Sequence, residues 1–335
     1  MKKLVALCLA AVFATVAFSA CGGKKQVEKV VKVGIVVPAT QSVAVAMNDK
    51  FKEIIESKTD GAIEVQLFPD GVLGGERELY DSVKDGKLEV IVIGSYFYNE
   101  VPQILITDFP FLYRSVDHAQ AVYNSPEVGG EIARVLEEKT GIKILGWGPN
   151  GVRSFSSAKP LEKLADFKGQ RIRMPNNKIH IALAKALGAN VVILPMGDIF
   201  TSLEQKVIDG QDNPLRTLIS YGWYEVQKYV FETNHMVASL EILASPQFWA
   251  SLTPEQQAIV AQAAQEASDY AWDHYKKSIS EDEKFLADNG LVVTVPTDDE
   301  KAQMQRLVEP IYTDLYKEYP WARDLVAKAK AINVQ

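Results

Sequence analysis

Two arginines lie close together in KGQRIRMPNN, residues 168–177. Strand-forming residues run to Met174, the next residue is a proline, which favours extended backbone before it, and two asparagines follow, which are typical first residues of a helix. Arg173 therefore lies near the carboxyl end of a predicted strand and beside a helix start, which is where α/β sheets bind ligands. A guanidinium there can hold a carboxylate or phosphate with paired hydrogen bonds. An ordinary structural salt bridge fits the same spacing, so both roles of Arg173 remain open.

The other arginine, Arg171, shares a strand face with Arg173, because side chains two residues apart point the same way. It lies nearer the start of the strand, away from the edge at which ligands bind. We therefore predict that Arg171 pairs with a surface acid and that Arg173 is the anion receptor.

The four histidines form no catalytic or metal-binding motif, because none is spaced for ligation with another histidine or a cysteine. His118 is predicted to lie on a helix surface near the start of that helix. His180 and His274 are predicted to be exposed on helices, and His235 is a candidate buried residue. The chain also has no GxSxG or Walker motif. The sequence therefore predicts no catalytic residue, no cofactor and no metal.

The elements that position these residues alternate between strands and helices, which is typical of an α/β fold with a parallel-type sheet. Runs of β-branched and aromatic residues predict the strands, at 29–38, 62–71, 89–97, 142–148, 151–159, 169–174, 189–195, 239–249 and 291–295. Helical spacing between these runs predicts the helices, including one over 178–187 and one over 298–318.

The pattern restarts after the glycines at 148 and 151, so we predict two α/β lobes joined by a hinge with a ligand cleft between them. Thr253 and Pro254 begin a helical run in which no glycine or proline occurs until Gly290, and this long helix is predicted to brace both lobes. The predicted boundaries are 31–149 plus about 239–275 for lobe I, and 150–238 plus about 276–335 for lobe II.

Length and composition agree with such a protein. The chain has 335 residues, enough for two domains of about 150 residues each. Its composition is 47% hydrophobic and 24% charged, which is ordinary for a globular protein. A net charge of −7 argues against a nucleic-acid partner, which requires clustered lysine and arginine. We expect a monomer.

The N-terminus predicts a lipoprotein signal peptide over residues 1–20. Lys2 and Lys3 precede an apolar run, 4–18, which is short for a membrane-spanning helix, and AFSACGG then resembles a bacterial lipobox. Cleavage before Cys21 would leave a cysteine that carries diacylglycerol and palmitate, followed by a tether over 21–30. The alternative is an uncleaved anchor with a buried thiol.

The cysteine count agrees with a protein that is exported and lipidated. The only other cysteine, Cys8, lies inside the apolar run and would be removed, so the mature chain would hold no disulfide and no thiol nucleophile. We predict a protein on the periplasmic or cell-surface side, attached to the membrane through lipid on Cys21.

Several segments together resemble one known family. These are GVRSFSS, LADFKGQRIRMPNN, LGANVVILPMGDIFTSLEQKVIDGQDNPL and YEVQKYVFETNH, and the resemblance covers roughly residues 31–320. The chain is similar to the substrate-binding subunits of TRAP (tripartite ATP-independent periplasmic) transporters. The resemblance implies a two-lobed periplasmic-binding-protein fold that binds a small organic acid between its lobes.

The resemblance also implies roles for single residues. Arg173 matches the arginine that clamps the ligand carboxylate, Arg153 matches a second contact, and Asn213 in DGQDNP matches a third. Sialic-acid-binding members have an acidic residue after the third strand, where this chain has Ser95 followed by Tyr96. That difference argues against a polyhydroxylated sugar and favours a small mono- or dicarboxylate.

Four residues are candidate apolar walls of the cleft, although core packing would explain each of them equally well: Tyr96, Trp147, Met196 and Tyr221. The predicted function is to capture an organic acid and deliver it to an ion-coupled permease, whose small and large integral membrane subunits are implied by the resemblance. The alternatives are a ligand-sensing lipoprotein that signals to a receptor and, more distantly, a periplasmic enzyme.

Overall fold

The structure of the chain is a computed structural model that describes residues 27–334. The predicted signal peptide, Cys8, Cys21 and the first part of the tether lie outside these residues.

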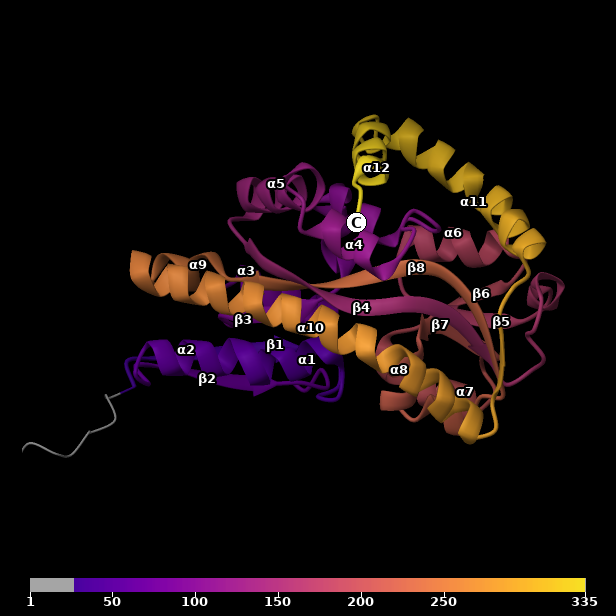
Figure 1. The fold of residues 1–335 in the computed structure, drawn as a ribbon, viewed down its shortest axis with the longest axis horizontal. Coiled ribbons are helices and arrows are strands. Elements are labelled where there is room, and N and C mark those ends of the chain that lie inside the picture. The colour runs from indigo at the N-terminus through magenta and orange to yellow at the C-terminus, as the bar shows by residue number, and fades with distance from the viewer. Residues whose placement is uncertain (1–26, 335) are drawn as a thin grey trace, which may run out of the picture.

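A single mixed sheet runs through the molecule, with strand order β2-β1-β3-β8-β4-β7-β5-β6 and β9 beside β8 (Figure 1). The strands are β1 (Lys29–Ile35), β2 (Ile63–Phe68), β3 (Val90–Ile93), β4 (Lys143–Ser157), β5 (Arg171–Met174), β6 (Asn190–Ile193), β7 (Gly210–Pro214), β8 (Tyr229–Ala244) and β9 (Val292–Thr294). Both ends of the sheet are parallel, and the central pairs of β3 with β8, β8 with β4 and β4 with β7 are antiparallel.

Twelve α-helices within the described residues cover the sheet. They are α1 (Ser42–Ala46), α2 (Glu53–Lys58), α3 (Glu76–Lys84), α4 (Val116–Tyr123), α5 (Glu131–Thr140), α6 (Lys178–Ala186), α7 (Ile199–Glu204), α8 (Leu215–Ser220), α9 (Pro246–Ala250), α10 (Pro254–Asp288), α11 (Asp298–Glu318) and α12 (Trp321–Ala331). Shorter helical segments are η1 (Met47–Lys52), η2 (Ser95–Asn99), η3 (Pro102–Asp108), η4 (Pro126–Gly130), η5 (Leu164–Phe167), η6 (Met196–Asp198) and η7 (Trp223–Glu225).

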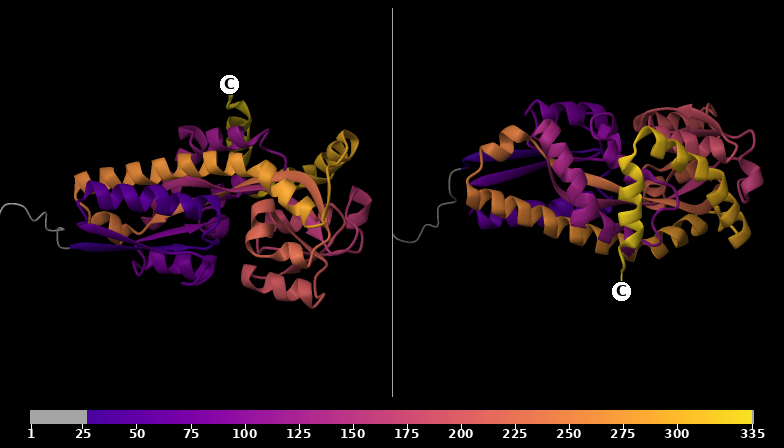
Figure 2. Two further views of the ribbon diagram at one scale, coloured as in Figure 1. Left: turned by 60° about the horizontal axis from the view of Figure 1, so that its bottom comes forward. Right: turned by 90° about the horizontal axis from the view of Figure 1, so that it is seen from above.

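Two lobes are visible in Figure 2, and the long strands β4 and β8 pass through both. The N-terminal lobe is built on β2-β1-β3 and the C-terminal lobe on β7-β5-β6. The sequence predicted two strands at 142–148 and 151–159, but the structure has one strand of 15 residues. Its register shifts against β8 between Pro149 and Gly151, so this segment is an irregularity inside a strand and not a break between two strands.

The helix α10 braces both lobes, as predicted. It spans 35 residues, and Thr253 and Gln256 form a reciprocal capping box at its start. Its first half packs against α1, η1 and β4, and later turns contact α8 and β9. In its middle, the indole of Trp272 donates a hydrogen bond to the Trp147 carbonyl of β4, at 2.8 Å. One helix thus contacts both lobes and the strands between them.

The C-terminal helices extend the fold beyond the prediction. The helix α11 packs against α6 of the C-terminal lobe, whereas α12, which the sequence analysis missed, packs against η3 and η4 of the N-terminal lobe. Arg114 anchors the end of α12 by donating to the carbonyls of Lys330 and Ile332. The residue boundaries of the lobes stay a prediction, and the last helix returns to the N-terminal lobe.

Among residues 27–334, no helix is both long enough and apolar enough to cross a membrane.

The contact between α10 and β4 depends on Gly146. A Cβ atom added there would lie 2.3 Å from Ser268 Oγ and 3.1 Å from the Ala264 carbonyl oxygen. We expect Gly146→Ala to lower the free energy of unfolding by about 1–3 kcal/mol, because a well-packed contact must open. Thermal unfolding followed by circular dichroism measures this.

The matched control is Gly130→Ala, where the nearest atoms to an added Cβ lie at 3.6 and 3.8 Å. This control should unfold at the temperature of the parent protein or above it. Combining Gly146→Ala with Ser268→Ala should recover part of the loss. If Gly146→Ala unfolds like Gly130→Ala, the helix is not held as closely as described.

Candidate functional site

A cleft of about 580 Å³ lies between the lobes. The N-terminal lobe contributes residues that follow β1 and β3 and the start of α3. The C-terminal lobe contributes residues from the carboxyl end of β5, the segment after β6, and β7. Parallel strands thus point their carboxyl ends at this cleft from both sides, which is the usual place for a ligand in α/β sheets.

Arg173 lies on β5 and faces this cleft, with 4% of its surface exposed. Its Nε donates to the Leu194 carbonyl at 2.8 Å. Among the described residues, no carboxylate lies within ion-pair distance of its guanidinium. Burial and the nearby charge of Arg153 lower the pKa of Arg173 to about 10, so it remains charged at neutral pH. A buried cation without a carboxylate partner is available to bind the carboxylate of a ligand.

Arg153 is arranged differently, because its charge is already neutralised by Asp212. The Arg153 Nε donates to Asp212 Oδ2 at 3.2 Å, and a terminal nitrogen bonds both the Asp212 carbonyl, at 2.6 Å, and its Oδ1. Burial raises the pKa of Asp212, but Arg153, His180 and His235 outweigh burial and hold it well below the usual range. Arg153 therefore adds a fixed, paired dipole to the cleft.

His235 was predicted as a candidate buried residue and is fully buried. Its Nε2 lies 2.9 Å from Asp212 Oδ2. Burial lowers its pKa. Asn213, which follows Asp212 on β7, lines the cleft, and its Nδ2 donates to Gln211 Oε1 at 2.7 Å.

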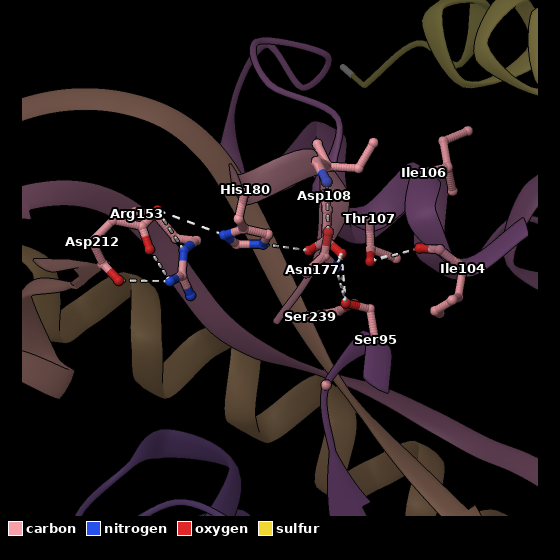
Figure 3. A network of polar contacts seen from close by, with 12 residues as sticks. Ser95, Ile104, Ile106, Thr107, Asp108, Arg153, Asn177, His180, Asp212 and Ser239 are labelled. Atoms are coloured by element: carbon pink, nitrogen blue, oxygen red, sulfur yellow. Dashed lines mark hydrogen bonds and ion pairs between the residues drawn. The ribbon is translucent and has the colours of Figure 1, made fainter. Parts of the chain in front are cut away.

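The N-terminal lobe brings carboxylates to the cleft. Ser95 begins η2 and donates through Oγ to Asp108 Oδ2 at 2.5 Å. Asp108 in turn accepts from Asn177 Nδ2, at 2.8 Å, and lies 3.2 Å from His180 Nε2 (Figure 3). The prediction of an exposed His180 was wrong, since only 4% of the residue is exposed. Asn177 also accepts from the Ile179 N–H, so it caps α6 as expected.

Glu76 is a cleft residue that the sequence analysis missed. It is the first residue of α3, follows two glycines, and accepts from the Gly94 N–H at 3.2 Å. Burial raises the pKa of its carboxyl, while the Gly94 bond and the charge of Arg173 oppose that rise. The available signal in the sequence was a helix start after two glycines, at the carboxyl edge of the predicted sheet.

Two of the four candidate walls line the cleft, namely Tyr96 and Met196. Trp147 does not; it is a core residue, stacked on Tyr123 with ring centroids 5.7 Å apart. Tyr221 is not a lining residue either, because it stacks on Trp223 and its hydroxyl points to the Val36 carbonyl, 3.4 Å away. These two aromatic side chains therefore pack against neighbouring residues and do not form walls of the cleft.

Arg171 and His118, which the sequence also singled out, have structural roles. Arg171 binds the buried Asp209 through Nε and a terminal nitrogen, at 3.1 and 2.7 Å, so the predicted ion pair is present, although its acid is buried. His118 was predicted on a helix surface but is fully buried, and its Nε2 lies 3.0 Å from the Ala329 carbonyl oxygen. Within residues 27–334, no group of three His, Cys, Asp or Glu side chains is arranged to hold a metal ion.

Two lobes, a polar cleft between them and one unpaired arginine in that cleft define a binding protein for a small anionic solute. The profile of the family described as "Bacterial extracellular solute-binding protein, family 7" matches residues 33–319, and the chain belongs to this family. It is a periplasmic solute-binding protein of the TRAP type and not an enzyme.

Proteins of known ligand resemble this chain over most of its length. The 2,3-diketo-L-gulonate-binding periplasmic protein YiaO of Escherichia coli is 32% identical over 282 residues, which cover 83% of this chain and 84% of that protein. The crystal structure of a TRAP periplasmic solute-binding protein from Haemophilus influenzae with bound L-gulonate is 34% identical. It has a TM-score of 0.86 and covers 90% of this chain and 98% of the other.

A third similar structure is a TRAP periplasmic solute-binding protein from Pseudomonas putida with bound D-glucuronate. It is 26% identical, has a TM-score of 0.85, and covers 91% of this chain and 98% of the other.

The contrast between the two arginines predicts opposite effects on stability. Arg173→Met removes a buried charge that has no carboxylate partner, so the ligand-free protein should unfold at an equal or higher temperature. Arg171→Met, two residues away, leaves the buried Asp209 with the Lys159 ammonium as its one remaining cation and with the backbone N–H of residue 171, and should lower the unfolding temperature. Differential scanning fluorimetry of both variants without added ligand makes the comparison. A larger loss for Arg173→Met than for Arg171→Met would show that Arg173 is a structural residue.

Proposed function

We propose that the cleft binds a hydroxylated monocarboxylate, a sugar acid of the gulonate or glucuronate kind, with Arg173 holding its carboxylate. The unpaired, buried guanidinium of Arg173 is the observation that supports this proposal most directly. A carboxylate entering the cleft would replace water around both charges with paired hydrogen bonds. Hydrogen bonds to charged groups contribute about 1.5–3 kcal/mol each, so two or three of them suit micromolar binding.

Asn213 and Arg153 are proposed as further contacts. Asn213 lines the same cleft and can donate without adding charge, and Arg153 presents a guanidinium already fixed by Asp212. Tyr96 and Met196 are proposed walls, and Ser95 is a proposed polar contact whose hydroxyl is oriented by Asp108.

The side of the cleft opposite Arg173 determines which chemical groups the rest of the ligand can carry. Glu76 and Asp108 lie there, and carboxylates accept hydrogen bonds from hydroxyl groups but repel a second carboxylate. This charge pattern favours a polyol chain with one carboxylate over a dicarboxylate. It reverses the preference drawn from Ser95, because Glu76 and Asp108 supply the acidic groups that the residue after the third strand does not. The ligands bound by the similar proteins, L-gulonate and D-glucuronate, have this pattern.

The physiological role that follows is delivery of the solute to a TRAP permease with a small and a large integral membrane subunit. Family membership supports this partner, since solute-binding proteins of the TRAP type serve such permeases. Attachment to the membrane through diacylglycerol and palmitate on Cys21 is proposed from the lipobox alone.

Titration calorimetry with a panel of acids tests the ligand class. We expect L-gulonate or D-glucuronate to bind with a dissociation constant in the micromolar range or below, and succinate and malate to bind at least about 100-fold more weakly, a difference of roughly 2.7 kcal/mol. Glu76→Gln should reduce the difference in affinity between sugar acids and dicarboxylates, because it should weaken the binding of sugar acids and strengthen that of dicarboxylates. Asp81→Asn, an exposed change on the same helix, should leave it unchanged.

Arg173→Ala should abolish detectable binding of every acid in the panel, while the far-ultraviolet circular dichroism stays that of the parent. Tighter binding of succinate than of any sugar acid would overturn the proposed ligand class. Unchanged binding by Arg173→Ala would overturn the clamp.

The anchor is tested separately. Cys21→Ser should move the protein from the membrane fraction to the soluble fraction of bacteria that express the full chain, and it should remove the lipid mass from the N-terminal peptide. Cys8→Ser, the control in the apolar run, should stay in the membrane fraction. Equal partitioning of the two variants would contradict lipidation at Cys21.

A further inference from the structure

Two polar side chains at the start of α6 reach across the cleft to the other lobe (Figure 3). Asn177 Nδ2 donates to Asp108 Oδ2 at 2.8 Å, and His180 Nε2 lies 3.2 Å from Asp108 Oδ1. All three residues are buried. Asp108 ends η3 in the N-terminal lobe, so both oxygens of one carboxylate are held by residues of the opposite lobe.

His180 connects this contact to the pair beneath the ligand clamp. Its other ring nitrogen, Nδ1, lies 3.7 Å from Asp212 Oδ2, the carboxylate that binds Arg153, a separation that is within ion-pair distance but too long for a hydrogen bond. Ionised carboxylates only accept hydrogen bonds, and a neutral imidazole has only one N–H to donate. A histidine between two carboxylates can form an ion pair with both only as the imidazolium. The geometry therefore favours the charged form of His180.

The charges around His180 come from four elements. They are Asp108 on η3, Asp212 on β7, Arg153 on β4 and His235 on β8. Burial lowers the pKa of His180, but the two carboxylates outweigh burial and the net shift is upward. With His180 charged and His235 neutral, two positive and two negative charges balance in a buried cluster. Loss of the proton from His180 leaves an uncompensated negative charge in it.

We infer that His180 is a positioning residue for solute binding, which holds the two lobes together as an imidazolium and couples the Arg153–Asp212 pair beneath the clamp to Asp108 of the other lobe. This inference rests on the proposal that the cleft is the solute site. The arrangement brings both lobes against a ligand only while His180 carries its proton, so solute affinity depends on pH.

The direction of this dependence follows from the upward shift. The contribution of His180 is complete below its unfolded pKa of 6.5 and is lost as pH rises through its higher folded value. His235 titrates lower, because its pKa is lowered, and so does not produce a loss in this direction. Affinity should therefore fall as pH rises above 6.5, by about tenfold for a coupling of ordinary size.

The contact between the lobes can be tested without any ligand. Dyes are attached through non-canonical amino acids at Val72, an exposed residue of the N-terminal lobe, and Glu204, an exposed residue on α7. Energy transfer in the parent protein should report a closed population that shrinks as pH rises from 6 to 9. In His180→Gln and in Asn177→Ser, which keeps an oxygen to cap α6, this population should be smaller already at pH 6. The same closed population in both variants as in the parent would overturn the inference.

The effect on binding is measured with L-gulonate as the probe, by calorimetry from pH 6 to pH 9. The parent should lose affinity as pH rises, whereas His180→Gln should bind more weakly at pH 6 and lose less affinity than the parent between pH 6 and pH 9. Any loss that remains in this variant is assigned to Glu241 on β8, whose pKa is raised by burial to about 8 and which interacts with the charge of Asp108. Asp108→Asn should move the loss to lower pH, because it removes one of the two carboxylates that stabilise the imidazolium.

The control is His274→Gln, a half-buried histidine on α10 whose Nδ1 lies 3.0 Å from Ser42 Oγ. It should keep the parent profile. A parental pH profile in His180→Gln would also overturn the inference. If L-gulonate fails to bind the parent protein, the proposed ligand is wrong, and the energy-transfer comparison still decides the role of His180.

Discussion

A buried positive charge without a carboxylate partner is the constraint on which this structure depends. Arg173 is held by one backbone carbonyl at the end of a four-residue strand, and its guanidinium faces the cleft. Such a charge is tolerated only in a framework whose packing is provided elsewhere. The long strands β4 and β8 and the helix α10 provide it, because they carry a continuous apolar core along both lobes. A second, smaller cluster lies beneath α7 and α8.

The long strands also explain which charged groups of the cleft are paired and which are not. Residues on β4, β7 and β8 near the junction of the lobes are buried from both sides, so their charged groups must be paired within the protein. Arg153, Asp212 and His235 satisfy one another there, which leaves Arg173 as the cation of the cleft that has no carboxylate partner among the described residues. Of the three arginines that line the cleft, Arg77 lies near Asp81 and Arg153 binds Asp212, so only Arg173 has no carboxylate partner among the described residues.

Local rules predicted most of the elements but missed β7 and the first half of β8, and they also failed where distant segments meet. The caps of α10 and α6 were legible from Thr253, Pro254 and Asn177, because capping involves residues a few positions apart. The ion pair of Arg171 followed from strand period and position. Burial of His180 and His118 was not predictable in this way, since each is covered by a segment 72 or 211 residues away. For Trp147, a cleft wall and core packing were both left open for the same reason, because its contacts with Tyr123 and Trp272 are tertiary.

The two faces of the cleft have opposite character, and this bears on how a solute closes it. The C-terminal lobe presents Arg173, and the N-terminal lobe presents Glu76 and Asp108. A ligand with a carboxylate at one end and hydroxyls along the rest satisfies both faces, so it stabilises the arrangement in which they meet. Without a ligand, the lobes already meet through the contacts of Asp108 with Asn177 and His180, and through a buried hydrogen bond from Gln41 to Thr217. On our inference, the charge on His180 sets part of the closing free energy that the protein supplies by itself, and the solute must add the rest.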